Sequence, residues 1–169
     1  MGNPERRNMV RLNIMTAYTK AALEEALIQA RRELNDASLA IGEAAGRESD
    51  WHDNAAFDYA NIEFDLKSAS LASLIRKLQD VEIITPRKQT DLIDIGNTVI
   101  VKFENEIDEE RFTILGPDDS GRKAGWLSCF SPLGASLIGR SEGEIAEYSL
   151  EQGRTQKVKV IKILRGDFE

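Results

Sequence analysis

Two aspartates, Asp50 and Asp53, are the residues of this chain whose type and spacing most clearly suggest chemistry. They lie in the segment GRESDWHD at 46–53, which has glycine, serine and aspartate but no apolar periodicity, as expected of a turn. At the start of a helix, a spacing of three places both side chains on one face, with roots about 5–6 Å apart, so that they can share one hard cation. Capping of that helix is the alternative role for the same acids. Trp51 between them favours a contact surface, because an aromatic residue at such a turn has no core to enter.

The turn must be held by the segments on either side, and the segment before it has a heptad pattern. The apolar positions alternate by four and three: Leu23, Leu27, Ala30, Leu34, Ala37, Ile41 and Ala44. This pattern predicts an amphipathic helix whose apolar seam packs against another helix. Thr16 or Thr19 is the expected cap at its start.

A second helix is predicted after the turn, from about 54 to 81. Four residues recur every seven positions and two others fill a companion row, which Lys67 interrupts: Phe57, Phe64, Leu71 and Leu78, then Leu74 and Val81. Two helices joined by a short loop pack antiparallel. With about 28–30 residues in each arm, this hairpin should be roughly 40–45 Å long and project from the rest of the protein.

The pattern changes after residue 84, where Pro86 and a polar stretch suggest a linker and alternating apolar residues then predict strands. The predicted strands are 99–103, 111–115, 126–130, 144–150 and 157–164, and one short helix is predicted at 131–139, with Ser131 as its N-cap and Pro132 in its first turn. We therefore predict an α+β protein with a helical hairpin at 1–84, a linker at 85–94 and a small β-sheet domain at 95–169.

Composition excludes several classes of protein. The net charge of −7 argues against a protein that coats nucleic acid, because phosphate binding depends on Lys and Arg. Cys129 is the only cysteine and His52 the only histidine, so neither a disulfide nor a cysteine-based zinc site can form within the chain. No stretch has the about 18–20 apolar residues of a membrane span. We expect a cytoplasmic protein with no membrane partner.

Four motifs in the same order resemble the GreA/GreB family of bacterial transcript-cleavage factors. The string DWHDNAAF at 50–57 resembles the family's hairpin tip, and the other motifs are TAYTKAALEEAL at 16–27, VEII at 81–84 and SPLGASLIGRSEG at 131–143. The resemblance spans about 16–163. It implies an antiparallel coiled-coil hairpin followed by an FKBP-like domain, an antiparallel sheet with one short helix.

The resemblance also implies a function. In the family the hairpin enters the secondary channel of RNA polymerase, and its tip acids help to hold the second catalytic magnesium, so that backtracked RNA is cut at its 3′ end. Asp50 and Asp53 match those acids, and Phe130, Ser131, Pro132 and Leu133 match the segment expected to bind the channel rim. The factor is then not itself an enzyme. The resemblance implies a monomer that holds no metal when free and shares Mg²⁺ with the polymerase, together with a nascent RNA partner and DNA binding.

The chain departs from the family pattern at positions that bear on this function. Asp53 stands where Glu is usual, which withdraws its oxygens by roughly 1.3–1.5 Å, and a misplacement of about 1 Å can cost 10²-fold in rate. Ala56 replaces a frequent acid, Phe57 a frequent Tyr, and Phe130 a polar residue. A core-facing strand position is the alternative role for Phe130.

Other functions remain open on the sequence alone. The first is a regulator that occupies the same polymerase channel but inhibits or merely competes without stimulating cleavage, as Asp53 and Ala56 suggest. The second is a prolyl isomerase, which would need an open aromatic pocket, although a domain of this size needs most of its aromatics for its core. The third is a coiled-coil adaptor that dimerises through the hairpin seam.

Overall fold

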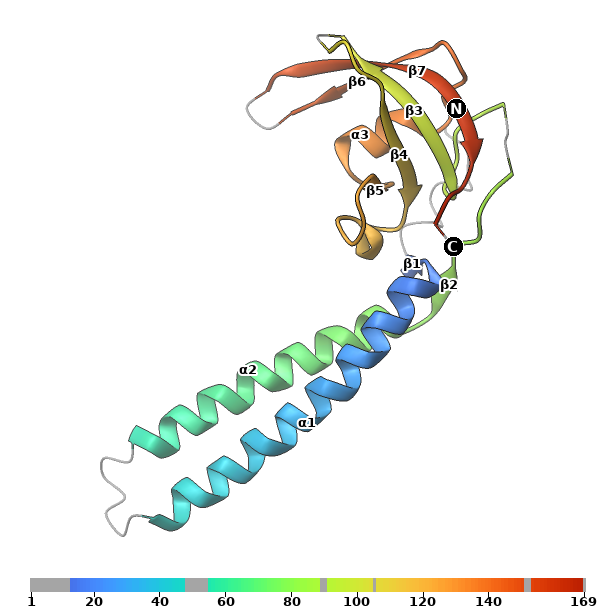
Figure 1. The fold of residues 1–169 in the computed structure, drawn as a ribbon. Helices are drawn as coiled ribbons and strands as arrows, with labels where there is room; N and C mark the ends of the chain where they lie inside the picture. Colours follow the sequence, from blue (N-terminus) through green and yellow to red (C-terminus); the bar gives the residue numbers. More distant parts are fainter. Residues whose placement is uncertain (1–12, 48–54, 89–90, 105, 151–152, 169) are drawn as a thin grey trace, which may run out of the picture. The chain divides into compact units, whose positions relative to one another are not determined.

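The structure, a computed structural model, describes residues 13–47, 55–88, 91–104, 106–150 and 153–168, and of residues 46 and 47 the backbone alone (Figure 1). The chain divides into two compact units. One is helical and spans Lys20–Gln79, and the other is globular and comprises the described parts of Met1–Thr19 and Asp80–Glu169. The predicted fold class, a helical hairpin with a small β-sheet domain and one short helix, is confirmed.

The helical unit consists of two helices that lie side by side (Figure 1). Helix α1 spans Ala17–Arg47 and helix α2 spans Ala55–Leu78. At 1.5 Å per residue their lengths are about 46 and 36 Å, close to the predicted arm length. Both heptad rows are the less exposed side of their helices: Leu23, Ala30 and Ala37 are buried in α1, and Ala60, which the predicted seam omitted, is buried in α2.

The break that Lys67 makes in the apolar row is filled by an ion pair. Its Nζ lies 2.7 Å from Oε2 of Glu33 on the facing helix. The hydrogen bond from Lys67 holds the pKa of Glu33 below its ordinary value, and the hydrogen bond to Glu33 raises the pKa of Lys67. The pair is partly exposed, so its contribution to stability is small, but it links the two helices at one register.

The globular unit is built on a five-stranded sheet with the order β5-β4-β3-β7-β6. Its strands are β3 (Asn97–Phe103), β4 (Glu110–Leu115), β5 (Trp126–Ser128), β6 (Ile145–Ser149) and β7 (Thr155–Arg165). All five strands lie where the alternating pattern predicts them. The neighbouring pairs are antiparallel except β4 and β5, which run parallel. The short helix α3 (Pro132–Leu137) begins after Ser131, whose Oγ accepts the N–H of Gly134 at 3.1 Å.

The main core lies between one face of this sheet and α3. Its fully buried members come from β3, β4, β6, β7 and α3: Val99, Val101, Ile114, Ala146, Val160, Ile163 and Leu137. Ile93, which the sequence placed in a polar linker, is also buried there. Arg87 N–H donates to the carbonyl of Gly96 at 2.9 Å, so this stretch is part of the globular unit.

Two short strands that the sequence did not predict also belong to the globular unit. Strand β1 (Asn13–Met15) pairs in parallel with β2 (Val81–Ile83), the stretch interpreted from the sequence as the exit from the hairpin. The predicted hairpin domain, 1–84, is therefore longer at both ends than the helical unit found here.

Candidate functional site

The segment that connects α1 to α2 contains Asp50 and Asp53, and these predicted site residues lie outside the described residues, as do Trp51 and His52. The structure describes the helices that bring the chain to this segment. Helix α1 ends at Arg47 and α2 begins at Ala55, so the connection is short and joins the ends of two adjacent helices (Figure 1). The two predicted helices are therefore found on either side of the segment, and the prediction that the segment itself is a turn lies outside the described residues.

The described residues next to this connection are strongly acidic. Arg47 at the end of α1 is the one Lys or Arg between positions 34 and 66. The stretches 36–45 and 55–66 contain five carboxylates: Asp36, Glu43, Asp58, Glu63 and Asp65. The first described cation that follows on α2 is Lys67, which is paired with Glu33. With this charge, the tip-proximal part of the hairpin should be attracted to a basic surface and to cations and repelled by phosphate.

The second predicted contact segment, Phe130–Leu133, follows β5 in the globular unit and includes the first two residues of α3. Phe130 is 52% exposed, so it is not the core-facing strand residue that the alternative reading required. The hydroxyl of Ser131 donates to the carbonyl of Ser128 at 2.7 Å while it caps α3. Leu133 packs on the main core. Of the four predicted residues, Phe130 and Pro132 are therefore the two whose side chains are exposed, and Ser131 and Leu133 position them.

Sequence reasoning missed the residue that holds the start of α1. Asp119 ends a 3-10 helix, η3 (Pro117–Asp119), and is completely buried. Its Oδ1 accepts the backbone N–H of Thr16 at 3.0 Å and the Thr16 hydroxyl at 2.7 Å, and its Oδ2 accepts the N–H of Gly116 at 3.1 Å. A string such as GPDDSG suggests only an exposed turn, and no local signal separates Asp119 from Asp118.

Thr16 connects this carboxylate to the helix. Its Oγ1 accepts the N–H of Thr19 at 3.2 Å, which is the N-cap bond that the sequence predicted. An anion at a helix N-terminus is also favoured by the helix dipole. Nearby, Tyr18 meets Trp126 edge to face at 5.8 Å between ring centroids, and the Nζ of Lys123 lies 4.4 Å from the Tyr18 ring centre. The first turn of α1 is thus fixed by polar and aromatic contacts within the globular unit.

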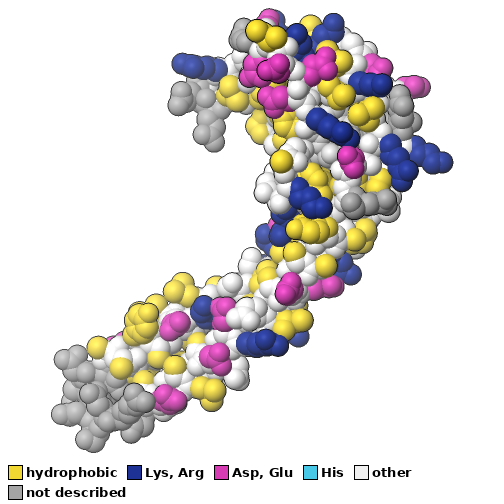
Figure 2. Space-filling view, viewed as in Figure 1, with side chains coloured by type: hydrophobic (Ala, Val, Ile, Leu, Met, Phe, Trp, Pro, Cys, Tyr) yellow, Lys and Arg dark blue, Asp and Glu magenta, His cyan; other side chains and the backbone are white. Residues whose placement is uncertain are grey.

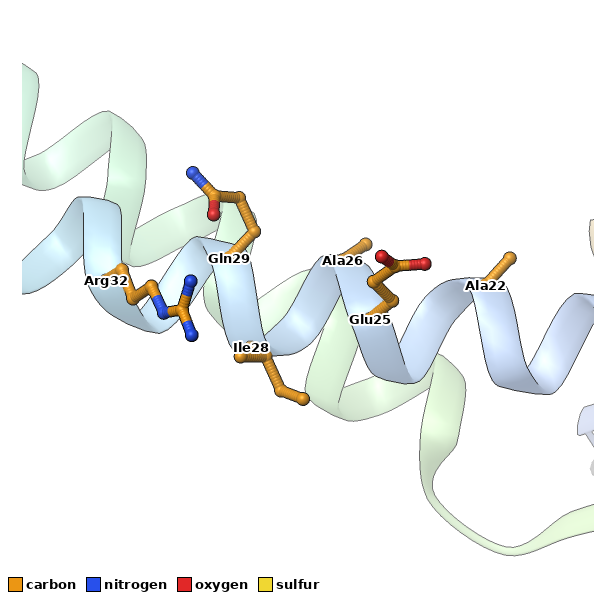
Figure 3. A pocket seen from close by; sticks show the side chains of 6 residues that line it. All are labelled: Ala22, Glu25, Ala26, Ile28, Gln29 and Arg32. Carbon is orange, nitrogen blue, oxygen red and sulfur yellow. The ribbon is translucent and has the colours of Figure 1, made fainter.

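Other candidate sites among the described residues carry less chemistry. A depression on the hairpin is lined by α1 alone, and Figure 3 shows its six side chains, among them Glu25 and Arg32, spread along a single helix. Within the described ranges no group of three or more His, Cys, Asp or Glu side chains is placed to hold a metal ion. Burial raises the pKa of the Cys129 thiol to about 11, which makes it a poor nucleophile. No described helix is long and apolar enough to cross a membrane.

Comparison with known proteins connects this architecture to one family. The family described as "Transcription elongation factor, GreA/GreB, C-term" matches residues 88–165. The transcription elongation factor GreA of Desulfotalea psychrophila is 31% identical over 159 residues, which cover 94% of this chain and 98% of the relative. The chain belongs to the GreA/GreB family. The GreA of Desulfovibrio desulfuricans is 30% identical and covers 79% of this chain and 82% of its own.

Solved structures of GreA/GreB-type factors were also matched. The crystal structure of GreA factor homolog 1 (Gfh1) of Thermus thermophilus is 20% identical, covers 90% of this chain and 99% of its own, and has a TM-score of 0.42. The GreA/GreB factor of Nitrosomonas europaea is 19% identical, covers 63% of this chain and 92% of its own, and has a TM-score of 0.37. Membership of the GreA/GreB family identifies the chain as a transcription elongation factor, an accessory protein rather than an enzyme.

Proposed function

We propose that this GreA/GreB-family factor works in the cytoplasm as a monomer, binds bacterial RNA polymerase through its secondary channel, and stimulates the polymerase's own cleavage of backtracked RNA. The observation that carries the proposal is the hairpin, in which two adjacent helices lead to a short connection that contains Asp50 and Asp53. The stretches 36–45 and 55–66 beside it hold five acids, and Arg47 is the one Lys or Arg between positions 34 and 66. Nascent RNA is then met within the complex rather than by the free protein.

The donor set at the connection suits magnesium but does not complete its shell. Asp50 and Asp53 supply the carboxylate oxygens that Mg²⁺ prefers, yet an octahedral ion needs six ligands. Two aspartates in the free protein would therefore bind it weakly, and the ion would be shared with carboxylates of the polymerase and with RNA phosphate. When bound, such an ion can activate water and stabilise a leaving oxygen. The part of this chain is to carry two carboxylates to the place where that charge is needed.

The globular unit is proposed to hold the channel rim through Phe130 and Pro132. Both side chains are exposed, and the capping bonds of Ser131 fix the backbone between them. An exposed aromatic beside a proline is a rigid apolar contact of the kind that dominates many protein interfaces.

The test is release of short 3′ RNA fragments from stalled, backtracked elongation complexes. We expect the wild-type factor to accelerate release and Asp50→Ala to abolish the acceleration. Glu25→Ala removes an exposed acid of α1 that lies about 25 residues from the tip acids along the chain, so it serves as the control and should retain most of the activity. No release at saturating wild-type factor would contradict the proposal.

A second candidate function is a channel-binding regulator that inhibits without cleavage. Two features favour it: Asp53 is one methylene shorter than the usual Glu, and Ala56 is an exposed residue of α2 where the family often has an acid. Measuring nucleotide addition and cleavage on the same complexes separates the two functions. An inhibitor slows addition and releases no fragments, and Asp53→Glu should then confer cleavage.

A further inference from the structure

Helix α2 carries a second apolar row that faces away from α1. Its members repeat with the heptad spacing of four and three, and we call them the outer stripe: Ala55, Tyr59, Ile62, Leu66 and Ala69. At about 100° per residue they lie roughly opposite the seam residues Phe57 and Phe64. Tyr59, Ile62 and Leu66 are 69, 59 and 66% exposed. Figure 2 shows hydrophobic side chains on the exposed surface of α2 near the grey connection.

The outer stripe is a continuous apolar row, unlike the exposed apolar residues of α1. Helix α1 also exposes two large apolar residues, Ile28 and Leu39, but Arg32 and Asn35 occupy the heptad positions between them. The outer stripe has no such interruption. A shallow groove runs along it and is bounded on the side of α1 by Glu33 and Lys67. A helix that is apolar on two opposite faces is the pattern of a helix with two partners, and α1 is only one of them.

The charges that flank the outer stripe define the chemistry of the second partner. In coiled-coil positions, Tyr59 and Leu66 are a, Ile62 is d, and the flanking e and g positions hold Asp58, Glu63 and Asp65. All three are acidic. The described structure shows no ion pair to Asp58 or Asp65, because the nearest cation along α2, Lys67, is turned to Glu33.

These charges also decide against a second copy of the chain as the occupant. Two outer stripes facing one another would place acids against acids in either the parallel or the antiparallel orientation. A helix with an apolar stripe flanked by Lys or Arg has the complementary charge, and such flanks select the partner and speed its association. The apolar row would supply most of the binding energy.

We propose that the outer stripe is a docking surface for a basic amphipathic helix of the polymerase, next to the place where the tip acids act. This inference rests on the proposed function and deepens it. It adds a second contact that fixes the rotation of the hairpin about its own axis, because a stripe on one side of α2 can meet its partner in one orientation only. The tip acids would then be oriented by an apolar contact that begins at Tyr59, six residues after Asp53 along the chain.

The experiment measures binding of the full chain, carrying an N-terminal fluorophore, to bacterial core RNA polymerase by fluorescence anisotropy. The test variant combines Tyr59→Gln, Ile62→Gln and Leu66→Gln, since glutamine keeps helix propensity while it removes apolar contact. We expect its Kd to rise at least about 30-fold, because three exposed apolar side chains that the complex would bury are lost. The matched control, Ile28→Gln with Leu39→Gln, removes similarly exposed residues from α1 and should change Kd less than about threefold.

A charge variant tests the flanks separately. Asp58→Lys with Asp65→Lys should weaken binding, and the loss should shrink as salt is raised, because screening removes the repulsion. Circular dichroism should show wild-type helicity in every variant, since all the changed residues are exposed.

Each outcome bears on a different claim. If the triple variant binds as tightly as the wild type, the outer stripe is not a docking surface, and the proposed function is unaffected. If the α1 control raises Kd as much as the triple variant does, the docking role of the outer stripe is also contradicted, because the loss of affinity is then not specific to the stripe. Absence of wild-type binding would contradict the proposed function, and with it the partner named here. A stable dimer in sedimentation that the triple variant abolishes would show that a second copy is the occupant instead.

Discussion

Asp119 stabilises the globular unit through buried hydrogen bonds that no pattern in the sequence predicts, so its replacement is the first prediction. The perturbation is Asp119→Ala, with Asp119→Asn as the conservative variant. The carboxylate is completely buried and accepts hydrogen bonds from Thr16 N–H, the Thr16 hydroxyl and Gly116 N–H. Removing it leaves the two backbone donors without an acceptor, while the hydroxyl can still turn to Thr19 Oγ1, 3.2 Å away.

The magnitude follows from those donors. A buried donor left without an acceptor costs about 1–3 kcal/mol, and removing a buried carboxylate also relieves its desolvation, which offsets part of the loss. We therefore expect Asp119→Ala to lower the free energy of unfolding by about 3 kcal/mol. Asp119→Asn keeps one acceptor oxygen but turns an NH₂ towards an N–H donor, and it should cost about 2 kcal/mol. For a unit of this size, 1 kcal/mol corresponds to about 4–8 °C in Tm.

Hydrogen exchange separates this local effect from general destabilisation. The amides of Thr16 and Gly116 should lose protection by about 100-fold in Asp119→Ala, since each 1.4 kcal/mol is tenfold. Asp108→Asn, an exposed aspartate of the same unit, is the control and should leave both amides and the Tm unchanged. In a double-mutant cycle, Thr16→Val should cost much less when Asp119 is already changed. A fall in Tm below about 3 °C with unchanged protection would refute the anchoring role of Asp119.

Three further predictions concern the hairpin, the buried thiol and the short helix. Lys67→Leu fills the apolar row, and denaturant titrations should show that the variant gains stability relative to the wild type as the pH is lowered from 7 to 3. The reason is that the pKa of Glu33 is lowered in the folded protein, so its ion pair stabilises the wild type above the unfolded pKa and that stabilisation is lost as the pH falls. Cys129, with its pKa raised from 9.0 to about 11, should react with a thiol reagent at pH 8 about 100-fold more slowly than an unshifted thiol, and fast labelling in the folded protein would contradict its burial. Gly134→Ala places a Cβ against the Ser128 carbonyl and should destabilise the globular unit by about 2 kcal/mol in thermal unfolding, whereas Ala135→Gly should cost only about 1 kcal/mol.

The parts of the fold that the sequence predicted are those with a repeating apolar pattern. The row from Leu23 to Ala44 predicted α1 and its seam, and alternation at Val99, Val101 and Phe103 predicted β3. In both cases one face is buried over several repeats, so many residues carry the same signal. Ser131 and Pro132 predicted the start of α3 because capping is a local interaction that involves neighbouring residues.

The parts that the sequence did not predict depend on contacts distant along the chain. Strands β1 and β2 have three residues each, too few for a periodic pattern, and they exist through pairing across some 65 residues. Asp119 is separated by 103 positions from Thr16, so its burial could not be read from its neighbours. Ile93 looks like part of a polar linker until the sheet that covers it is known.

Parts of the candidate site could not be predicted either, because exposure depends on how distant segments pack. The exposed Phe130 was ambiguous, because an aromatic at the end of a strand pattern can face either the core or solvent. The outer stripe was visible in the spacing of Tyr59, Ile62 and Leu66, but a row becomes a candidate surface only when the seam with α1 is known to lie elsewhere. Asp50 and Asp53 stay predictions, since they lie outside the described residues.

The central claim is that Asp50 and Asp53 supply carboxylates to a magnesium ion shared with the polymerase. The measurement that tests it most directly is the rate of 3′ fragment release from one backtracked complex, taken across a range of Mg²⁺ concentrations at saturating factor. With the wild-type factor, fragment release by the complex should reach half its maximal rate at a lower Mg²⁺ concentration than with Asp50→Ala, which leaves only the polymerase's own slow release. Asp53→Glu should lower that concentration further or raise the maximal rate. Identical magnesium dependence for wild type and Asp50→Ala, or no release by the wild type at any concentration, would contradict the account.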